Sequence, residues 1–291
     1  MKNKVVIFGE MLWDCLPAGS VPGGAPMNVA LNLHQLGLDS NLISAVGKDS
    51  DGKNLLDFLR TFELPLNLIQ ESETHETSKV LVDDSDKENI KYNIVSPVAW
   101  DFIEWNNEID LAVSEADAFV FGSLGVRNPK SLSTILKLLQ HQVIRIFDAN
   151  LRPPFYDFEV IEKLLGFADI LKINDDELVV FADYFNVDPS IESVCAYLDE
   201  HFPMDLICIT KGSKGAVIYQ KGEMISHQGY KVQVEDSIGA GDAFLSGFIK
   251  SYLEEKSLKE TLDFACKLGA FVATKKGGTP RYKLEEIQKY S

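Results

Sequence analysis

The chain has 291 residues, 45% of them apolar, and a formal net charge of −16 at pH 7. The apolar content is enough for a sizeable core, while the acidic balance and the lack of a Lys/Arg-rich run argue against a nucleic-acid surface and an anionic-membrane patch. The charge does not exclude a phosphorylated ligand, because backbone N–H groups can hold phosphate without net positive charge.

Cysteine usage and the first residues indicate a reduced, cytoplasmic protein. The four cysteines are scattered, with no Cys-x-x-Cys pair and no clustered histidines, so neither a zinc site nor a disulfide framework is expected. The first apolar run, residues 5–8, is too short for a signal-peptide core or a membrane span. We therefore expect cytoplasmic localisation.

Short apolar runs alternate with helical patterns along the chain, without an internal repeat or a low-complexity linker. This alternation predicts an α/β fold with crossover connections and a largely parallel sheet covered on both faces, as a single domain over residues 1–291. Ligands of such sheets bind beyond the C-terminal ends of the strands. The predicted strands are 5–8, 42–46, 118–121, 143–147, 170–173, 206–210 and 216–219, and the predicted helices are 27–36, 52–61, 131–140, 175–184 and 191–201.

One segment interrupts the alternation. Residues 79–83 and 89–95 have the pattern of two strands around a polar turn at residues 84–88. This predicts a hairpin that projects from the main sheet. An ordinary edge hairpin is the alternative.

Polar residues and a glycine pair follow the first predicted strand. Asp14 comes soon after it, and Gly23 and Gly24 run into the helix that carries Asn28 in its first turn. One interpretation is a solvated turn aspartate and a tight turn at a helix start. The other is close approach of the backbone to a polar ligand whose hydroxyls bind Asp14 and Asn28.

Two further motifs follow strands. Arg152 lies in Asp-Ala-Asn-Leu-Arg-Pro-Pro at residues 148–154, where the prolines stop a helix; it is either a surface arginine or a guanidinium that faces a phosphate or an acidic group. Asn174 and Glu177 have the spacing of a capping box at the start of the next helix. Residues 210–215 connect two apolar strands and have the pattern of a hairpin loop.

The glycine-rich stretch at residues 236–244 precedes an amphipathic helix. Gly239 and Gly241 bracket one small residue, so successive N–H groups can point into one concavity that binds an anion. Asp242 lies in the first helical turn, at the positive end of the helix. It is either a capping residue or, if a phosphate fills the concavity, a base that takes a proton from an attacking hydroxyl.

Other chemistries find no support in the sequence. There is no Gly-x4-Gly-Lys-Ser/Thr loop, so the chain is not a P-loop kinase, and Phe244 stands where a dinucleotide fingerprint needs its third glycine. No Gly-x-Ser-x-Gly or His-Glu-x-x-His motif occurs, and the five histidines are scattered.

Taken together, the motifs resemble the PfkB (ribokinase-like) family of sugar kinases over nearly the whole chain. Residues 236–242, Asp-Ser-Ile-Gly-Ala-Gly-Asp, are similar to the family's C-terminal signature, Asp-Thr/Ser-x-Gly-Ala-Gly-Asp. The Gly-Gly-Ala-Pro-x-Asn run at 23–28 and the Asp-x-Asn-x-Arg-Pro run at 148–153 resemble the fructokinase branch. Residues 174–177 match the family's Asn-x-x-Glu motif, and residues 276–280 resemble the loop that closes the adenine and monovalent-cation sites.

The resemblance implies a fold, an activity and a set of roles. The fold would be a ribokinase-like three-layer sandwich with a small β lid from about residues 10–25 and 78–100, often also the dimer contact. The activity would be ATP-dependent phosphorylation of the primary hydroxyl of a ketohexose, most similar to fructokinase, with Mg²⁺ and optionally K⁺. The resemblance implies that Asp242 is the general base and that Gly239, Ala240 and Gly241 form the anion hole. The residues implied at the sugar are Asp14, Gly23, Gly24, Asn28 and Arg152, and those implied at the nucleotide and Mg²⁺ are Asn174, Glu177, Thr210, Gly212, Gly215 and Gly277. Carbonyls of Asp236 and Ile238 would bind a monovalent cation.

Departures from the family pattern leave alternatives open. Many members carry an arginine in the second lid strand, but residues 91–97 contain none. This argues against an acidic sugar, because burying its carboxylate without a cationic partner is costly. Arg152 keeps the acidic sugar open as an option. Ala265 or Cys266 stands where ribokinase-type members often place Asn near the adenine. A 2-keto-3-deoxygluconate, ribose or nucleoside kinase is the alternative within the family. A non-catalytic sugar-sensing protein is the alternative from another class, against which the intact Asp242 speaks.

Overall fold

The computed structural model describes residues 3–16, 19–83 and 91–288. A large sheet lies at the centre of these residues, and its strands are β1 Lys4–Phe8, β4 Asp39–Gly47, β5 Ile69–Ser72, β8 Ala118–Gly122, β9 Ile144–Asp148, β10 Ile170–Asn174, β11 Leu206–Thr210, β12 Ala216–Gln220 and β13 Glu223–His227. Their order is β13-β12-β11-β10-β9-β8-β1-β4-β5. Neighbours from β5 to β11 are parallel, and β12 and β13 follow as antiparallel strands. The predicted α/β fold with a largely parallel sheet is confirmed.

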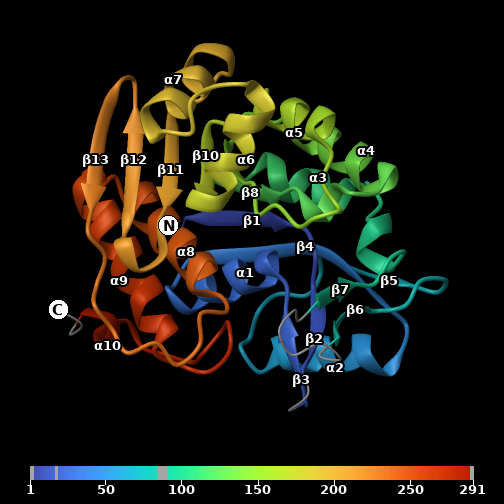
Figure 1. Cartoon of the computed structure of the whole chain (residues 1–291). Helices are drawn as coiled ribbons and strands as arrows, with labels where there is room; N and C mark the ends of the chain where they lie inside the picture. The colour runs from blue at the N-terminus through green and yellow to red at the C-terminus, as the bar shows by residue number, and fades with distance from the viewer. Residues whose placement is uncertain (1–2, 17–18, 84–90, 289–291) are drawn as a thin grey trace.

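Helices cover both faces of this sheet (Figure 1). One face carries α3 Asn107–Ser114, α4 Pro129–Leu138, α5 Phe158–Leu165, α6 Asp175–Phe185 and α7 Ile191–His201, which share one apolar core. The other face carries α1 Ala25–Gln35, α2 Ser50–Arg60, α8 Ala240–Leu253, α9 Leu258–Ala273 and α10 Leu284–Gln288, which share a second core. No helix of the described residues is long and apolar enough to cross a membrane.

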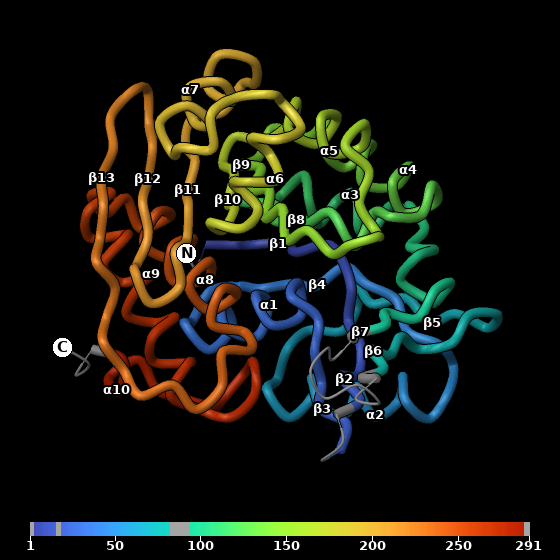
Figure 2. The backbone as a smooth tube through the Cα atoms, in the orientation of Figure 1, coloured from blue at the N-terminus to red at the C-terminus, as the bar shows by residue number. Residues whose placement is uncertain are grey.

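A second, small sheet stands apart from the main one. Its strands are β2 Leu12–Leu16, β3 Gly19–Gly23, β6 Ser78–Asp83 and β7 Lys91–Ile94, in the order β3-β2-β6-β7. β6 and β7 pair antiparallel, so the predicted projecting hairpin is confirmed, while its predicted turn lies outside the described residues. β2 and β6 are far apart in sequence but lie side by side as a parallel pair (Figure 2).

The C-terminal ends of the parallel strands meet at one edge of the main sheet. Register pairs Phe8 with Phe121, Gly122 with Asp148, and Asn174 with Thr210. Three short 3-10 helices, η1 Ala99–Phe102, η2 Leu124–Val126 and η3 Gly212–Lys214, lie in the connections. Polar residues that follow different strands are therefore gathered at this edge, where sheets of this type bind ligands.

Candidate active site

The first turn of α8 forms where the chain reverses at Gly239. Gly239 has a left-handed backbone (φ 74°), and its carbonyl accepts a 2.8 Å hydrogen bond from the N–H of Ala243. A Cβ at this position would lie 2.4 Å from the Cα of Gly278, so only glycine fits both the backbone angle and the neighbouring loop. The first N–H groups of a helix have no partner within the helix and can bind an anion, although Ala240 N here donates a 3.3 Å hydrogen bond to Ser237 O. Anion binding at this turn stays a prediction.

Asp242 lies in this first turn and is held from a second helix. The Nδ2 of Asn28, on α1, donates a 2.8 Å hydrogen bond to Asp242 Oδ2. Burial raises the pKa of Asp242 to about 6, against the lowering effect of the Asn28 hydrogen bond. At neutral pH the carboxylate is thus ionised but considerably more basic than an exposed aspartate, which suits a general base.

Asn28 has spare hydrogen-bonding capacity at the same place. Its side chain is buried, and its Oδ1 has no hydrogen-bond partner among the described residues. A buried polar atom without a partner is uncommon in folded proteins, and a ligand hydroxyl beside Asp242 could satisfy it. The structure thus places Asn28 and Asp242, predicted from separate motifs, in direct contact, while their roles stay predictions.

Asp14 lies on β2, not in a solvated loop, and Gly23 of β3 makes room for it. A Cβ on Gly23 would stand 2.1 Å from Asp14 Oδ2, and a Cβ on Gly24 would stand 2.6 Å from the carbonyl oxygen of Glu10. Burial raises the pKa of Asp14. Both positions need glycine because the chain packs closely against Asp14 and Glu10 there. Contact with a ligand there stays a prediction.

Arg152 follows β9 in an exposed position close to the acidic residues of the site. Its positive charge lowers the pKa of Glu10, Asp14 and Asp242, partly offsetting their burial. Arg152 is therefore within electrostatic range of both Asp14 and Asp242, which were predicted from other motifs. A guanidinium in this position can approach an anionic group of a substrate.

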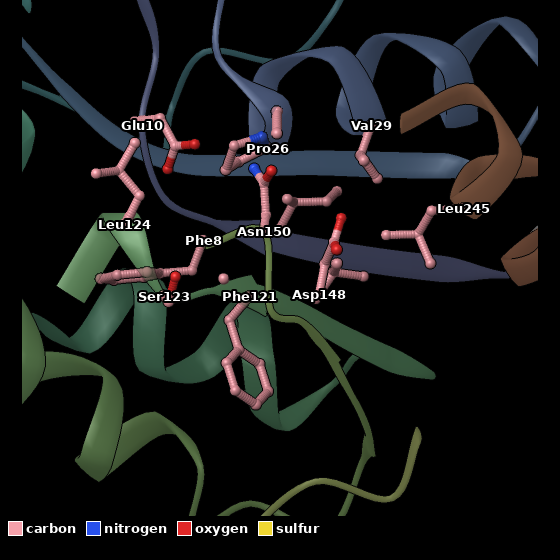
Figure 3. Close-up of a pocket in the computed structure, with 14 residues that line it drawn as sticks. Phe8, Glu10, Pro26, Val29, Phe121, Ser123, Leu124, Asp148, Asn150 and Leu245 are labelled. Carbon is pink, nitrogen blue, oxygen red and sulfur yellow. The ribbon is translucent and has the colours of Figure 1, made fainter. Parts of the chain in front are cut away.

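Three charged residues of the site were not selected from the sequence. Glu10 is buried, and burial raises its pKa to about 7. Lys172 Nζ lies 2.7 Å from Asp148 Oδ1, and both side chains are 8% exposed. Figure 3 shows Glu10, Asn150 and Asp148 among the residues that line a pocket. Its cavity has a volume of about 20 Å³, large enough for one water molecule. Two of these residues could have been found from the sequence, because Lys172 interrupts an apolar predicted strand and Asp148 directly follows another predicted strand.

Asn174 and Glu177 form the predicted capping box at the start of α6. Asn174 Oδ1 accepts from the N–H of Glu177, and Glu177 Oε2 accepts from the N–H of Asn174, both at 2.8 Å. Glu177 Oε1 accepts a further 2.7 Å bond from Leu151 N, next to Arg152. Since both oxygens already accept backbone bonds, this carboxylate fits Mg²⁺ better through water than as a direct ligand.

The residues predicted at the nucleotide occupy two connections. Thr210 ends β11, and the turn to β12 closes with a 2.7 Å hydrogen bond from Lys211 N to Gly215 O, which confirms the predicted hairpin loop. Gly212 has open space around it, whereas a Cβ on Gly215 would lie 2.0 Å from the carbonyl oxygen of His227. These contacts are all within the protein, and binding of a nucleotide by these residues stays a prediction.

Asp236 joins the two segments predicted at the monovalent cation. Its Oδ1 accepts from Ile238 N at 2.9 Å, and its Oδ2 accepts from Gly277 N at 3.1 Å. The described residues contain no cluster of three His, Cys, Asp or Glu side chains that could hold a metal ion. A cation here would therefore depend on backbone carbonyls, which suits a hard ion such as K⁺.

The arrangement combines a raised-pKa carboxylate, an orphan amide oxygen and a helix N-terminus, which suits proton removal beside a bound phosphoryl group. A family model described as pfkB family carbohydrate kinase matches residues 7–283. The chain belongs to this family. The PfkB assignment agrees with the resemblance of residues 236–242 to the family signature.

Relatives of this PfkB kinase extend over nearly its full length. It is 28% identical to a fructokinase of Escherichia coli, with 95% of each chain covered, and 30% identical to the probable fructokinase-7 of Arabidopsis thaliana, with 96% of this chain and 89% of the relative covered. Among solved structures, the fructokinase of Xylella fastidiosa with bound ATP is 23% identical with a TM-score of 0.87, covering 100% and 98% of the two chains. A Vibrio cholerae fructokinase, bound to fructose, ADP and potassium, is 22% identical with a TM-score of 0.85, covering 99% and 98%. The ribokinase-like fold is thereby confirmed.

Proposed function

We propose that this PfkB protein is an ATP-dependent fructokinase that converts D-fructose to fructose 6-phosphate. The observation that carries the proposal is Asp242, with a pKa of about 6, bonded to Asn28 at the N-terminus of α8. The full-length similarity to fructokinases supports fructose as the sugar. The carbohydrate-kinase family itself supports phosphoryl transfer.

In the proposed reaction, Asp242 takes the proton from the primary hydroxyl of the sugar as this oxygen attacks the γ-phosphorus of ATP. The N–H groups of Gly239, Ala240 and Gly241 bind the oxygens of the transferring phosphoryl group, where charge accumulates. Mg²⁺ on the nucleotide phosphates would neutralise part of their charge, with Asn174 and Glu177 holding its water shell. Carbonyls of Asp236 and Ile238, together with Gly277, would hold K⁺ beside the anion hole.

The small sheet is the proposed lid over the sugar. It carries Asp14 on its inner strand β2 and Gly23 on its edge strand β3, and Asn28 follows in the first turn of α1. Closure over the sugar would exclude water, which is the obvious competing acceptor. Leu81 on β6 is 44% exposed and gives this sheet an apolar outer position, which supports a homodimer contact at the lid.

A coupled assay of ADP release tests the proposal. The purified protein is given Mg-ATP and K⁺ with fructose, tagatose, ribose, 2-keto-3-deoxygluconate, adenosine or fructose 6-phosphate. We expect release with fructose far above the other acceptors. Release with another member of the panel would replace the substrate and keep the mechanism. No release with any of them, despite sugar-dependent thermal stabilisation, would indicate a sugar-binding protein instead.

A further inference from the structure

Lys172 is a charged residue in a position that the fold otherwise fills with apolar side chains. It lies on β10 two residues after Ile170, on the sheet face that packs against α8, whereas Leu171 and Ile173 belong to the core of the opposite face. Its side chain is 8% exposed. An ammonium so far from water is retained only where close partners or a ligand compensate for the lost hydration.

Carboxylates surround the ammonium on its protein side. Asp148, directly opposite on β9, accepts its 2.7 Å hydrogen bond. Burial disfavours the charged form, but Asp148, Glu177 and Asp242 outweigh it and raise the pKa of Lys172. The ammonium of Lys172 therefore lies among three carboxyl groups, one of which, Asp242, belongs to the first turn of α8. Without this ammonium, their negative charges would not be compensated from this side.

The first turn of α8 lies next to the ammonium at Gly241. A Cβ added to Gly241 would lie 3.9 Å from Lys172 Nζ, and among the described residues outside the helix and the adjacent chain no other heavy atom comes within 4 Å of that point. Because Gly241 has no side chain, the backbone of this turn and the ammonium are close neighbours. The same turn is the N-terminus of α8, whose first N–H groups have no partner within the helix and can bind an anion.

We propose that Lys172 completes the anion hole: held in place by Asp148, its ammonium contacts the phosphoryl group bound at the N–H groups of Gly239, Ala240 and Gly241. This inference rests on the proposed kinase function and adds a residue to it. Without Lys172, only backbone N–H groups would attract the polyphosphate, and the carboxylates of Asp242, Asp148 and Glu177 would repel it. A fixed ammonium removes that repulsion and strengthens its contact as charge shifts onto the leaving and transferring oxygens.

The competing explanation is that Lys172 only neutralises Asp148. The two explanations differ in the variants Lys172→Met, Lys172→Arg and the double variant Asp148→Asn/Lys172→Met, in which both members of the ion pair are removed together. The matched control is Arg145→Met, because Arg145 on β9 forms a 2.7 Å ion pair with Asp169, the residue before β10, at the opposite end of these strands. Folding of each variant is checked by thermal unfolding.

Two readouts are measured on the full-length protein. Binding of inorganic tripolyphosphate, followed by isothermal titration, is expected to weaken at least about tenfold in Lys172→Met and in the double variant, and to stay unchanged in Arg145→Met. With the sugar that the wild type phosphorylates, kcat is expected to fall about 10²-fold while KM for the sugar changes little, since a donor to the transition state is lost. Lys172→Arg keeps the positive charge. Its affinity for tripolyphosphate and its kcat are expected to lie between those of the wild type and Lys172→Met.

Wild-type tripolyphosphate affinity in a folded Lys172→Met variant would overturn the inference, as would recovery of wild-type kcat in the double variant. The proposed function fails separately. If the wild type phosphorylates no sugar but binds tripolyphosphate in a Lys172-dependent manner, the anion site stands and the kinase assignment of this chain falls.

Discussion

Asp242 combines two properties that suit a base for sugar phosphorylation, a position in the first turn of α8 and a raised pKa. Asp242→Asn keeps the size of the side chain and can still accept the hydrogen bond of Asn28, so the fold should be preserved. We expect kcat to fall by about 10²–10⁴-fold, the usual contribution of general-base catalysis, with the affinity for the sugar retained. Steady-state ADP release and sugar titration measure the two quantities.

The control for that variant is Asp57→Asn, which makes the same chemical change at an exposed carboxylate of α2. It should leave kcat unchanged. Phosphorylation by Asp242→Asn at a rate near that of the control would remove Asp242 from the mechanism.

Glu10 links the site to the pH dependence of stability. Its folded pKa of about 7 lies above the ordinary value of 4.5, so the folded state holds the proton more tightly than the unfolded state. The resulting stabilisation is complete below about pH 4.5 and is lost as pH rises to about 7. At roughly 1.4 kcal/mol per pKa unit, the loss is about 3 kcal/mol.

Glu10→Gln is neutral throughout and should lack this loss. Between pH 4.5 and 8, the free energy of unfolding of the wild type should therefore fall by about 3 kcal/mol more than that of the variant. Urea unfolding at a series of pH values checks this, with Glu115→Gln as an exposed control. Parallel pH curves for wild type and Glu10→Gln would show that Glu10 ionises normally.

At the scale of elements, the start of α8 depends on the loop that contains Gly278. In Gly239→Ala, the new methyl group would meet the Gly278 backbone and the residue would keep a left-handed φ of 74°. Gly37→Ala is the matched control, because its φ is 87° but no atom lies within 4 Å of the added Cβ. The control should lose about 1–2 kcal/mol through the backbone angle alone.

We expect Gly239→Ala to lose more stability than Gly37→Ala and to lose sugar phosphorylation, because the loop of residues 277–279 must move away from the anion site. Thermal unfolding and ADP release measure both effects. Equal stability losses with full activity would mean that the loop adjusts freely around the helix start.

The elements that the sequence predicts well are those with a strong local signal. Alternating apolar runs predict the seven inner strands, and the glycine stretch before Phe244 predicts the start of α8. Strands β2 and β3 have weaker patterns and pair through contacts between distant segments, so local reasoning leaves Asp14 in a loop. Lys172 and Asp148 meet only because β9 and β10 are neighbours in register, which no single stretch of sequence reveals.

On the scale of the whole molecule, one sheet serves two cores. In β1, Val6 and Phe8 pack on one face, while Val5 and Ile7 pack on the other. The two helical layers therefore share their central strands, and loss of either layer exposes the sheet on which the other depends.

This sharing predicts a single unfolding transition. Phe181→Ala in one core and Phe248→Ala in the other should each lower the stability of the whole chain by about 3–5 kcal/mol, since both side chains are at most 1% exposed. Val179→Ala, at a position 54% exposed, is the control and should change little. Two resolved calorimetric transitions, only one of them shifted in each variant, would show that the layers unfold independently.

The small sheet has a consequence for protein engineering. Its inner strands β2 and β6 come from segments separated by α1, β4, α2 and β5, and they pair in parallel. A graft intended to change the preferred sugar must therefore exchange residues 12–23 and 78–94 together. Exchange of one segment alone would pair β2 of one parent with β6 of the other, and such chimeras should lose activity whichever parent supplied Asp242.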